Sequence, residues 1–490
     1  MTMTQREDPP AGLEPSHLCA LPAAELARRI AHREVTAREV VDAHLGRIDE
    51  VNPTVNAVTT ALADSALAEA ARIDIAVADG QPLGPLAGVP FTIKENIDVA
   101  GQPTTDGVVA FRDRVAAVDA PAVAQLRAAG AIPIARTNMP DLGMRWHTDS
   151  GLFGATRNPW NAALSPAGSS GGEAVALATG MSPLGIGNDY GGSIRLPSAA
   201  AGTVGLRPTA GRVASASSTN PFPPPPTLQL FAVDGPMGRR VEDVRLAYEL
   251  MCGPDSRDPK WVPIPARQPV PDQFRVAVTT DPGAGGVDPG VVAAVRRAAD
   301  ALGDAGAIVE EADPPQVLEA ADLWRTLTTA ELLGVLDGLI RPLGSADAST
   351  YLEQSMAHVA RLDLAGYVDA LARRHAIAVA WSGFYAGYDL VLGPVATQPF
   401  HAVGFDLGGP DNADALWHSH RLVVSVNLLG LPAVAVPVGL DDAHLPQGVQ
   451  LIADRFREST CLHAGLIVEQ ALGSITPIDP RPGPDQARSR

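Results

Sequence analysis

The stretch of this sequence that most constrains its fold runs from Ala167 to Pro197 and reads AGSSGGEAVALATGMSPLGIGNDYGGSIRLP. Serines and glycines crowd both ends of one short helix-compatible segment, a composition typical of a backbone that approaches a substrate closely. A helix is expected over 173–179 and a strand over 184–186. The spacing predicts that Ser169 and Ser193, near the two ends of this unit, meet in one pocket.

Strand-like and helical patterns alternate upstream of this stretch. Apolar runs at 89–93 and 131–135 flank a helical pattern over 122–129, and such alternation is typical of βαβ units in an open, largely parallel sheet. Lys94 would then lie at the carboxyl end of a strand, where sheets of this kind hold their active sites. On these residues alone, an ordinary surface lysine is the simpler interpretation.

The flanking regions predict further helices and strands. Near the N-terminus, helices are expected over 23–32 and from Thr36, whose capping-box spacing to Glu39 begins a helix that Asn52-Pro53 should end. The chain reads as mainly helical from about 318 to 386. Short aliphatic runs predict buried strands over 390–392, 433–438 and 449–452, followed by a last helix over 459–472.

All 490 residues are interpreted as one domain. Residues 1–15 read as a flexible tail, 65–213 as the core that carries the chemistry, and about 254–390 as an embedded helical subregion that shapes the pocket. The Ser- and Pro-rich segment 214–226 is too irregular for helix or strand. It is either a stiff polyproline connection or a rim over the pocket mouth, with Phe222 as an apolar contact.

Composition narrows the classes of function. A net charge of −18 without a basic stripe argues against a nucleic-acid partner, and no stretch approaches the 18 or so apolar residues that a membrane span needs. Three widely spaced cysteines without a Cys-x-x-Cys pair suit a reducing cytoplasm and give neither a disulfide framework nor a zinc site. The first 12 residues lack the apolar core of a signal peptide. We therefore expect a cytoplasmic protein with no membrane partner, no cofactor and no metal.

A second segment, which contains Lys94, adds to the motifs of 167–197. Residues 88–101 read GVPFTIKENIDVAG, with Lys94 directly after a short apolar strand. Together with 167–197, this segment resembles the amidase-signature family, the amidohydrolases that use a Ser-cisSer-Lys triad. The resemblance implies an α/β fold, an α/β/α sandwich with a large mixed, mostly parallel central sheet flanked by helices. It continues through most of the chain in TNMPDLG from Thr137, FGATRNPWN from Phe153, VGLRPTAGRV from Val204, NLLGLPAVAVPVG from Asn427 and GVQLIA from Gly448.

The resemblance also implies three catalytic residues. Lys94 matches the catalytic lysine, Ser169 the bridging serine, and Ser193 the nucleophile that accepts the acyl group. Neutral Lys94 would deprotonate Ser169, which in turn would deprotonate Ser193. A free lysine titrates near 10.4, so a base that works near pH 7 to 8 needs its pKa lowered by roughly 2 to 3 units, which burial can supply. Glu95 and Asp98 would oppose that shift, so we expect both carboxylates to point away from Lys94.

Backbone groups around the nucleophile are expected to stabilise the oxyanion. Successive N–H groups converge on one oxygen only where side chains do not crowd them. The predicted oxyanion hole therefore consists of Tyr190, Gly191, Gly192 and Ser193. The predicted supporting residues are Gly168, whose bond to Ser169 is cis in the family, Ser170, and the flanking pair Asp189 and Arg195. Ala167, Asn188 and Tyr190 depart from common family residues, which changes the expected pocket shape.

The segment after the Thr-Asn-Met motif is expected to line the acyl side of the pocket. Gly143, Met144, Trp146 and Phe222 are the predicted substrate contacts, although simple core packing explains them equally well. An aromatic ring and a thioether favour apolar or aryl substrates. The predicted function is hydrolysis of the C–N bond of a small amide, anilide or carbamate (urethane) through an acyl-enzyme. The chain most resembles aryl and xenobiotic amidases, nylon-oligomer hydrolases and urethanases, and a monomer or homodimer is expected.

Three alternatives stay open. The chain is compatible with the glutamine-hydrolysing component of a transfer-RNA-dependent amidotransferase, which would need partner subunits. Gly168–Gly172 formally matches the Gly-x-Ser-x-Gly elbow of an α/β-hydrolase esterase with Ser170 as nucleophile, although 161–166 is a poor strand. The third alternative is a catalytically silent binding protein on the same fold, in which Lys94, Ser169 and Ser193 would have no catalytic role. His147 lies nearest to the motifs among the histidines, and a pocket or surface role explains it more simply than a role as the base.

Overall fold

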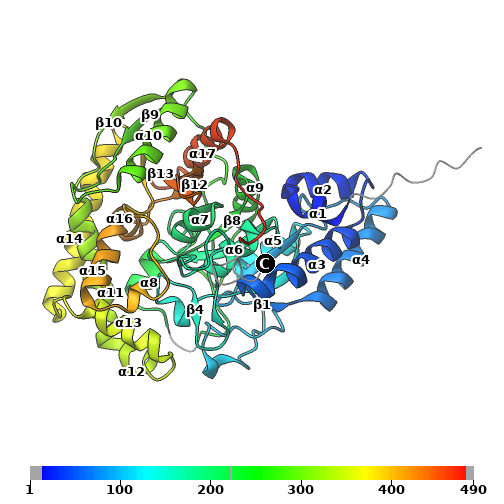
Figure 1. Ribbon diagram of the computed structural model, residues 1–490, viewed down its shortest axis with the longest axis horizontal. Helices are drawn as coiled ribbons and strands as arrows, with labels where there is room; N and C mark the ends of the chain where they lie inside the picture. Colours follow the sequence, from blue (N-terminus) through cyan, green and yellow to red (C-terminus); the bar gives the residue numbers. More distant parts are fainter. Residues whose placement is uncertain (1–13, 221–222, 482–490) are drawn as a thin grey trace, which may run out of the picture.

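An 11-stranded sheet forms the centre of the molecule (Figure 1). The structure is a computed structural model that describes residues 14–220 and 223–481. In spatial order the strands are β1, β3, β2, β6, β8, β7, β12, β13, β11, β9 and β10. Their bounds are β1 Val58–Ala61, β2 Pro90–Lys94, β3 Ile132–Thr137, β6 Leu184–Asp189, β7 Val204–Arg207, β8 Val233–Gly238, β9 Arg275–Val278, β10 Ile308–Glu311, β11 Leu390–Pro394, β12 Ala433–Leu440 and β13 Pro446–Ala453. A separate hairpin pairs β4 (Asp149–Ser150) with β5 (Gly154–Ala155).

The central sheet is mixed, as the resemblance to the amidase-signature family implied. Parallel pairs form two groups, β3–β2–β6 and β11–β9–β10. Antiparallel pairs through β8, β7, β12 and β13 join these groups, and β1 runs antiparallel at one edge. The largely parallel character that was expected is thus found within the two groups. The first group carries the strand that ends at Lys94.

Helices cover both faces of the sheet and complete an α/β/α sandwich. Along β12, Val434 and Val436 pack into a core with α9 and α17, whereas Ala433 and Ala435 face cores built with α7, α11 and α16. Figure 1 shows the N-terminal helices α1 to α4 at the right of the view and α11 to α16 at the left. The N-terminal half contains α1 Pro15–Ala20, α2 Ala23–Ala31, α3 Ala37–Val55, α4 Ala63–Ala78, α5 Pro121–Ala128, α6 Gly171–Ala178, α7 Arg195–Ala201, α8 Pro226–Phe231 and α9 Val241–Met251. The C-terminal half contains α10 Pro289–Asp304, α11 Val317–Glu331, α12 Asp337–Ile340, α13 Ala346–Met356, α14 Leu364–Tyr385, α15 Pro410–Ser419, α16 Arg421–Leu429 and α17 Glu458–Leu472.

The start of α3 follows the prediction, but its end does not. The Glu39 N–H donates to Thr36 Oγ1 at 3.0 Å and the Thr36 N–H donates to the Glu39 carboxylate at 2.7 Å, which completes the capping box. The helix passes through Pro53 and ends at Val55. Proline in the last turn removes a single helical hydrogen bond, and the N–H of Asn56 closes that turn by donating to a carbonyl four residues earlier at 2.7 Å.

Two predicted segments lie at the margins of the described chain. Segment 214–220 is irregular, as expected, and α8 begins only at Pro226. Phe222 and residues 1–13 of the predicted tail lie outside the described residues, and α1 begins at Pro15. Over residues 14–220 and 223–481, no helix combines the length and the apolar character needed to span a bilayer.

Candidate active site

Lys94 is the last residue of β2 and is completely buried (0% exposed). Its Nζ atom donates to Ser169 Oγ at 2.7 Å and to Asn188 Oδ1 at 2.6 Å. The amide nitrogen of Asn188 donates to Asn96 Oδ1 at 2.8 Å, which turns the Asn188 carbonyl toward Lys94. The strand end and the first serine of the 167–197 stretch therefore meet, as predicted, and Asn188 is a contact that the sequence analysis did not identify.

The surroundings of Lys94 favour its neutral form. Burial lowers its pKa to about 7, against opposing effects from Asp189, Asp234, Asp106 and Glu173. Glu95 and Asp98 point elsewhere, as predicted. Glu95 accepts hydrogen bonds from two threonine hydroxyls at 2.5 and 2.7 Å, and Asp98 accepts from threonine and serine hydroxyls, including those of the 217–219 loop. A substantial fraction of Lys94 is therefore the free amine near pH 7, as a general base requires.

The segments that carry Ser169 and Ser193 are held together through the backbone. The N–H of Ser170 donates to the carbonyl of Ser193 at 3.1 Å, and the bond between Gly168 and Ser169 is cis. Ser193 is 6% exposed and lines a cavity, whereas Ser170 is fully buried at the start of α6, with its hydroxyl 3.4 Å from a backbone carbonyl. In the described segment 156–170 no strand precedes Ser170. The elbow geometry that the esterase alternative requires is thus missing.

Asp189, at the end of β6, anchors the loop that follows it. Its carboxylate pairs with Arg195 at 3.0 Å and accepts from the N–H of Gly192 at 2.8 Å. Both charged side chains are completely buried. Burial would raise the pKa of Asp189, but Arg195 and Arg207 hold that pKa well below its usual range. The predicted pair is therefore present, and the buried anion fixes the backbone before the nucleophile.

The N–H groups expected to form the oxyanion hole differ in their partners. The N–H of Gly192 donates to Asp189, so Gly192 supports the loop and, contrary to the prediction, is not free to bind an oxyanion. For the N–H groups of Tyr190, Gly191 and Ser193, the described part of the chain provides no acceptor. The carbonyl of Gly191 accepts from the Trp146 indole at 2.9 Å, so both polar groups of the peptide between Gly191 and Gly192 are engaged and this peptide is held in place. Three of the four predicted N–H groups therefore remain available to a ligand.

A cavity of about 170 Å³ opens beside Ser193. Gly143, Met144 and Trp146, three of the four predicted substrate contacts, line it, and the fourth, Phe222, is not described. Pro225 of the proline-rich segment also lines the cavity, which favours the rim interpretation of that segment. The remaining wall includes Tyr190, Trp324, Glu331, Tyr351, Met356 and Trp417.

Aromatic rings that the sequence analysis missed form much of this wall. The ring centroids of Trp417 lie 4.6 Å from Trp146 and 5.2 Å from Trp324, and Tyr190 lies 5.1 Å from Trp324. Trp324 belongs to α11, inside the predicted helical subregion. Trp417 belongs to α15, so the pocket wall extends past residue 390, where that subregion was expected to end. Isolated tryptophans have no sequence pattern that separates a pocket wall from a core.

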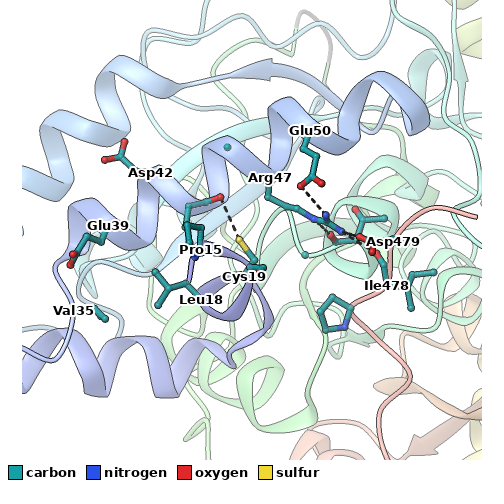
Figure 2. A pocket seen from close by; sticks show the side chains of 16 residues that line it. Pro15, Leu18, Cys19, Val35, Glu39, Asp42, Arg47, Glu50, Ile478 and Asp479 are labelled. Carbon is teal, nitrogen blue, oxygen red and sulfur yellow. Dashed lines mark hydrogen bonds and ion pairs between the residues drawn. The ribbon is translucent and has the colours of Figure 1, made fainter. Parts of the chain in front are cut away.

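A larger cavity of about 660 Å³ lies elsewhere, between α1, α3 and residues 477–479 (Figure 2). Arg47 crosses it and pairs with Glu50 at 3.0 Å and with Asp479 at 2.6 Å. The Cys19 thiol there donates to a backbone carbonyl at 3.4 Å, and burial raises its pKa to about 11. A thiol that stays protonated is a poor nucleophile near neutral pH. The smaller cavity beside Ser193 is therefore the candidate active site.

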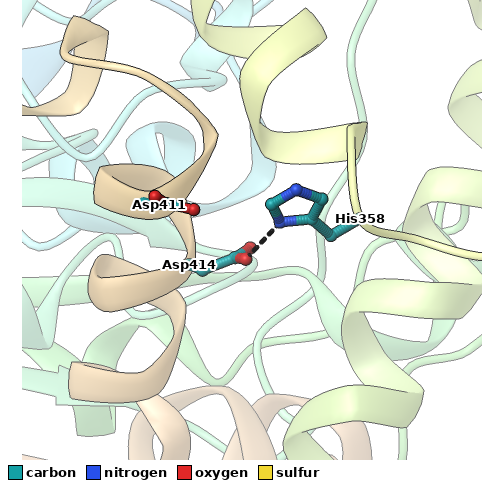
Figure 3. A group of neighbouring side chains, drawn as sticks. All are labelled: His358, Asp411 and Asp414. Atoms are coloured by element: carbon teal, nitrogen blue, oxygen red, sulfur yellow. Dashed lines mark hydrogen bonds and ion pairs between the residues drawn. The ribbon is translucent and has the colours of Figure 1, made fainter.

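Within the described residues, a single group of side chains has the spacing to hold a metal ion (Figure 3). It comprises His358, which follows α13, and Asp411 and Asp414 of α15. His358 Nδ1 lies 2.5 Å from one oxygen of Asp414, and Arg325 donates to the other oxygen at 2.7 Å. The guanidinium already compensates that carboxylate, and none of the three side chains lines the cavity beside Ser193. We assign this group no part in the chemistry.

Comparisons with known proteins agree with the geometry. The amidase family model matches residues 39–462. Indoleacetamide hydrolase of Bradyrhizobium diazoefficiens is 38% identical, over 92% of this chain and 87% of that protein. Acylamidase of Rhodococcus erythropolis is 33% identical, over 90% of this chain and 93% of that protein. A glutamyl-tRNA(Gln) amidotransferase subunit of Symbiobacterium thermophilum is 35% identical, over 90% and 95% of the two chains.

Solved structures show the same architecture. A bacterial aryl acylamidase of the amidase-signature family superposes with a TM-score of 0.79 at 28% identity, covering 92% of this chain and 96% of that one. A 6-aminohexanoate cyclic dimer hydrolase gives a TM-score of 0.80 at 28% identity, covering 93% and 97%. Fold and sequence together define a hydrolase of carbon–nitrogen bonds other than peptide bonds. The chain belongs to the amidase-signature family.

Proposed function

We propose that this amidohydrolase cleaves small amides that carry an aromatic group, with Ser193 as nucleophile, Ser169 as proton relay and Lys94 as general base. The observation that carries the proposal is the buried contact of 2.7 Å between Lys94 and Ser169, beside a cavity that contains Ser193. Activation by an adjacent base is what a serine hydroxyl needs to attack a carbonyl. The lowered pKa of Lys94, about 7, suits that base.

The proposed reaction has two halves that use the same groups. Neutral Lys94 takes the proton of Ser169 as Ser169 takes that of Ser193, and Ser193 Oγ forms a bond to the substrate carbonyl carbon. The N–H groups of Gly191 and Ser193 stabilise the resulting oxyanion, and removing one such donor typically costs about 3 to 4 kcal/mol. Ser169 then protonates the leaving nitrogen, the C–N bond breaks, and water hydrolyses the acyl-enzyme by the reverse proton transfers.

The aromatic wall supports an aryl substrate. Trp146, Trp324, Trp417 and Tyr190 surround the cavity, and aromatic rings prefer one another in tilted or stacked contacts. A volume of about 170 Å³ is close to the roughly 150 Å³ of an apolar cavity that binds benzene. The indoleacetamide hydrolase and the acylamidase among the relatives are consistent with such a substrate. An aryl carbamate presents the same carbonyl chemistry and belongs to the proposed range.

Glutamine hydrolysis is the second candidate, because glutamyl-tRNA(Gln) amidotransferase subunits are among the relatives. A free glutamine carries a carboxylate that needs a cation. The cation in the cavity wall, Arg145, already pairs with Asp406 at 2.8 Å and with Asp149 at 3.4 Å. The aromatic wall also offers little to a short polar side chain. Both observations favour the aryl amide.

The proposal is tested by turnover of three substrates by the purified chain: phenylacetamide, methyl N-phenylcarbamate and glutamine. We expect hydrolysis of the aryl amide and loss of at least about 10³-fold in kcat for Ser193→Ala. Ser170→Ala is the matched control, and it should lose far less because the Ser170 hydroxyl makes one weak contact. Undiminished turnover by Ser193→Ala would remove Ser193 as nucleophile. Preferred turnover of glutamine would replace the aryl amide as substrate.

A further inference from the structure

The loop from Asp189 to Ser193 carries the N–H groups of the proposed oxyanion hole, and its peptide groups are held to different degrees. Hydrogen bonds fix the carbonyls of Asp189, Gly191 and Gly192. Their donors are Arg207 at 2.7 Å, the Trp146 indole at 2.9 Å and the N–H of Leu196 at 2.8 Å. In the peptide between Tyr190 and Gly191, neither the carbonyl nor the N–H has a partner among the described residues. The direction of the Gly191 N–H therefore depends on how the Tyr190 side chain is held.

The Tyr190 side chain is held at its ring and at its hydroxyl. Its ring stacks with that of Phe231 at 6.4 Å between centroids, and its centroid lies 5.1 Å from that of Trp324. Its hydroxyl lies 2.6 Å from Thr227 Oγ1. Thr227 and Phe231 are fully buried at the two ends of α8. A single short helix therefore contacts both parts of the tyrosine.

Glu331, the last residue of α11, sets the direction of the hydrogen bond between the two hydroxyls. Its side chain is buried, with the residue 6% exposed, and it accepts from the N–H of Thr227 at 2.9 Å and from the Thr227 hydroxyl. An ionised carboxylate can only accept, and a threonine hydroxyl has a single hydrogen to donate. Because Thr227 gives that hydrogen to Glu331, the Tyr190 hydroxyl has to donate to Thr227 Oγ1. The result is one directed chain of hydrogen bonds from Tyr190 to Glu331.

The carboxylate is a costly choice for this position. Burying a charge costs free energy unless it is paired, and the groups of the described residues that donate to Glu331 are neutral. They belong to Thr227 and to Tyr367, whose hydroxyl donates at 2.5 Å. An apolar side chain would serve the packing of α8 against α11 (Figure 1) without that cost. The carboxylate therefore calls for a role beyond packing.

We propose that Glu331 is a positioning residue for the oxyanion hole, which acts through Thr227 and the Tyr190 hydroxyl on the N–H group of Gly191. This inference rests on the proposed function, because it takes Gly191 as a donor to the oxyanion. Tyr190 departs from the common family residue, so this arrangement is not a general feature of the family. Glu331 itself takes no part in the proton transfers.

The first part of the test measures kcat and KM for phenylacetamide in Tyr190→Phe, which keeps the ring and removes the hydroxyl. Loss of a whole oxyanion donor typically lowers kcat by about 10²- to 10³-fold, so we expect a misdirected donor to lower it by roughly 10-fold. KM should change by less than about 2-fold, because the oxyanion forms only after the substrate has bound. An unchanged kcat would overturn the proposal.

The second part shows whether Glu331 acts through that hydroxyl. Glu331→Gln keeps the shape but weakens the hold on Thr227, and should lower kcat by roughly 3- to 10-fold. In the Tyr190→Phe background the same change should have almost no further effect on kcat, whereas effects that multiply would overturn the proposal. Tyr367→Phe is the matched control and should stay close to the wild type, because its hydroxyl donates to Oε1 of Glu331 and the Thr227 hydroxyl to Oε2.

The third part separates the oxyanion hole from a general loosening of the fold by using a trifluoromethyl ketone that carries the phenylmethyl group of the substrate. Ser193 Oγ forms a bond to its carbonyl carbon, the carbonyl electron pair moves onto the oxygen, and the serine proton passes through Ser169 to Lys94. The adduct carries the oxyanion, so Tyr190→Phe should weaken inhibition by the ketone in proportion to its loss in kcat/KM. A lower kcat with undiminished inhibition would overturn the proposal.

Failure of the proposed function would look different. A wild type that hydrolyses no phenylacetamide would reject the proposed function, and this inference with it. A wild type that hydrolyses phenylacetamide, with kcat unchanged in Tyr190→Phe, would reject the inference alone.

Discussion

Lys94 Nζ lies 2.7 Å from Ser169 Oγ, and both side chains are buried. The contact joins the carboxyl end of β2 to Ser169, which lies two positions before α6 begins at Gly171, and α6 packs against β2. Burial keeps much of the lysine neutral near pH 7, and Asn188 holds its amino group from the other side. The base is therefore positioned by the rigid part of the fold.

The first prediction concerns the pH dependence of kcat/KM. The proposed base must be neutral, and its pKa is about 7, so activity should rise with pH through an apparent pKa near 7 and level off above it. The measurement is kcat/KM for phenylacetamide between pH 5 and 9. An acid limb below about pH 5 would instead indicate a carboxylate base, and a limb near 10 would indicate a lysine with an ordinary pKa.

The second prediction is that Lys94→Met inactivates the enzyme but stabilises the fold at pH 7. The folded-state pKa of about 7 lies below the unfolded value near 10.4, so the unfolded chain binds a proton that the folded chain releases. The buried lysine therefore lowers the free energy of unfolding, and this destabilisation is fully present below pH 7 and fades as pH rises toward 10. The destabilisation amounts to roughly 4 to 5 kcal/mol, and Lys94→Met removes it. The same substitution loses two hydrogen bonds, which together contribute about 2 kcal/mol.

The net gain expected for Lys94→Met is therefore about 2 kcal/mol at pH 7, measured as the free energy of unfolding in urea. At pH 10 the gain should vanish or reverse. Equal stability of variant and wild type at both pH values would show that the buried lysine carries no penalty, and would contradict its lowered pKa.

The third prediction uses Asn188, whose carbonyl oxygen accepts from Lys94 at 2.6 Å. Asn188→Leu removes an acceptor that stabilises the ammonium form, so the acid limb should move to lower pH by roughly one unit. Asn188→Asp adds a carboxylate at the same place, which should raise the pKa of Lys94 by roughly 1 to 3 units and move the limb upward. The two pH profiles should shift in opposite directions. Shifts of the same sign would place the titrating group elsewhere.

Local sequence patterns were sufficient to predict the strand and the helix that position this site. The apolar run before Lys94 and the helix after Ser169 both depend on neighbours in the sequence, and both formed where expected. Lys94 and the 190–193 loop follow the adjacent parallel strands β2 and β6, whose carboxyl ends share one edge of the sheet. The approach of Ser169 to Lys94 depends instead on the irregular segment before α6. The resemblance to a known family supplied the catalytic roles of Lys94, Ser169 and Ser193, which composition and periodicity alone left open.

Contacts between segments far apart in the chain could not be predicted from the sequence. Trp417 reaches the cavity from α15, more than 200 residues after Ser193, and no local pattern marks it. The N–H of Gly192 was assigned to the oxyanion hole because its neighbours are small, yet Asp189 binds it. Such details depend on side-chain directions and on competition between acceptors, which the order of residues does not reveal.

The last prediction concerns the buried pair between Asp189 and Arg195, which lie 3.0 Å apart with no exposure to solvent. Asp189→Asn keeps the shape but leaves Arg195 without its countercharge, and removing one partner of a buried pair typically costs about 3 to 5 kcal/mol. The same change weakens the anchor of the Gly192 N–H, so kcat should fall as well. The measurement is urea unfolding combined with turnover of phenylacetamide.

Two controls separate this effect from a general loss of charge. Glu310→Gln breaks the exposed pair with Arg275, whose side chains are 41% and 46% exposed, and should cost far less stability because water screens such a pair. Adding Arg195→Met to Asp189→Asn removes the uncompensated cation, so the double variant should lose less stability than the two single changes summed. Strict additivity would mean that the two charges do not interact, and that the loop before Ser193 is held by packing alone.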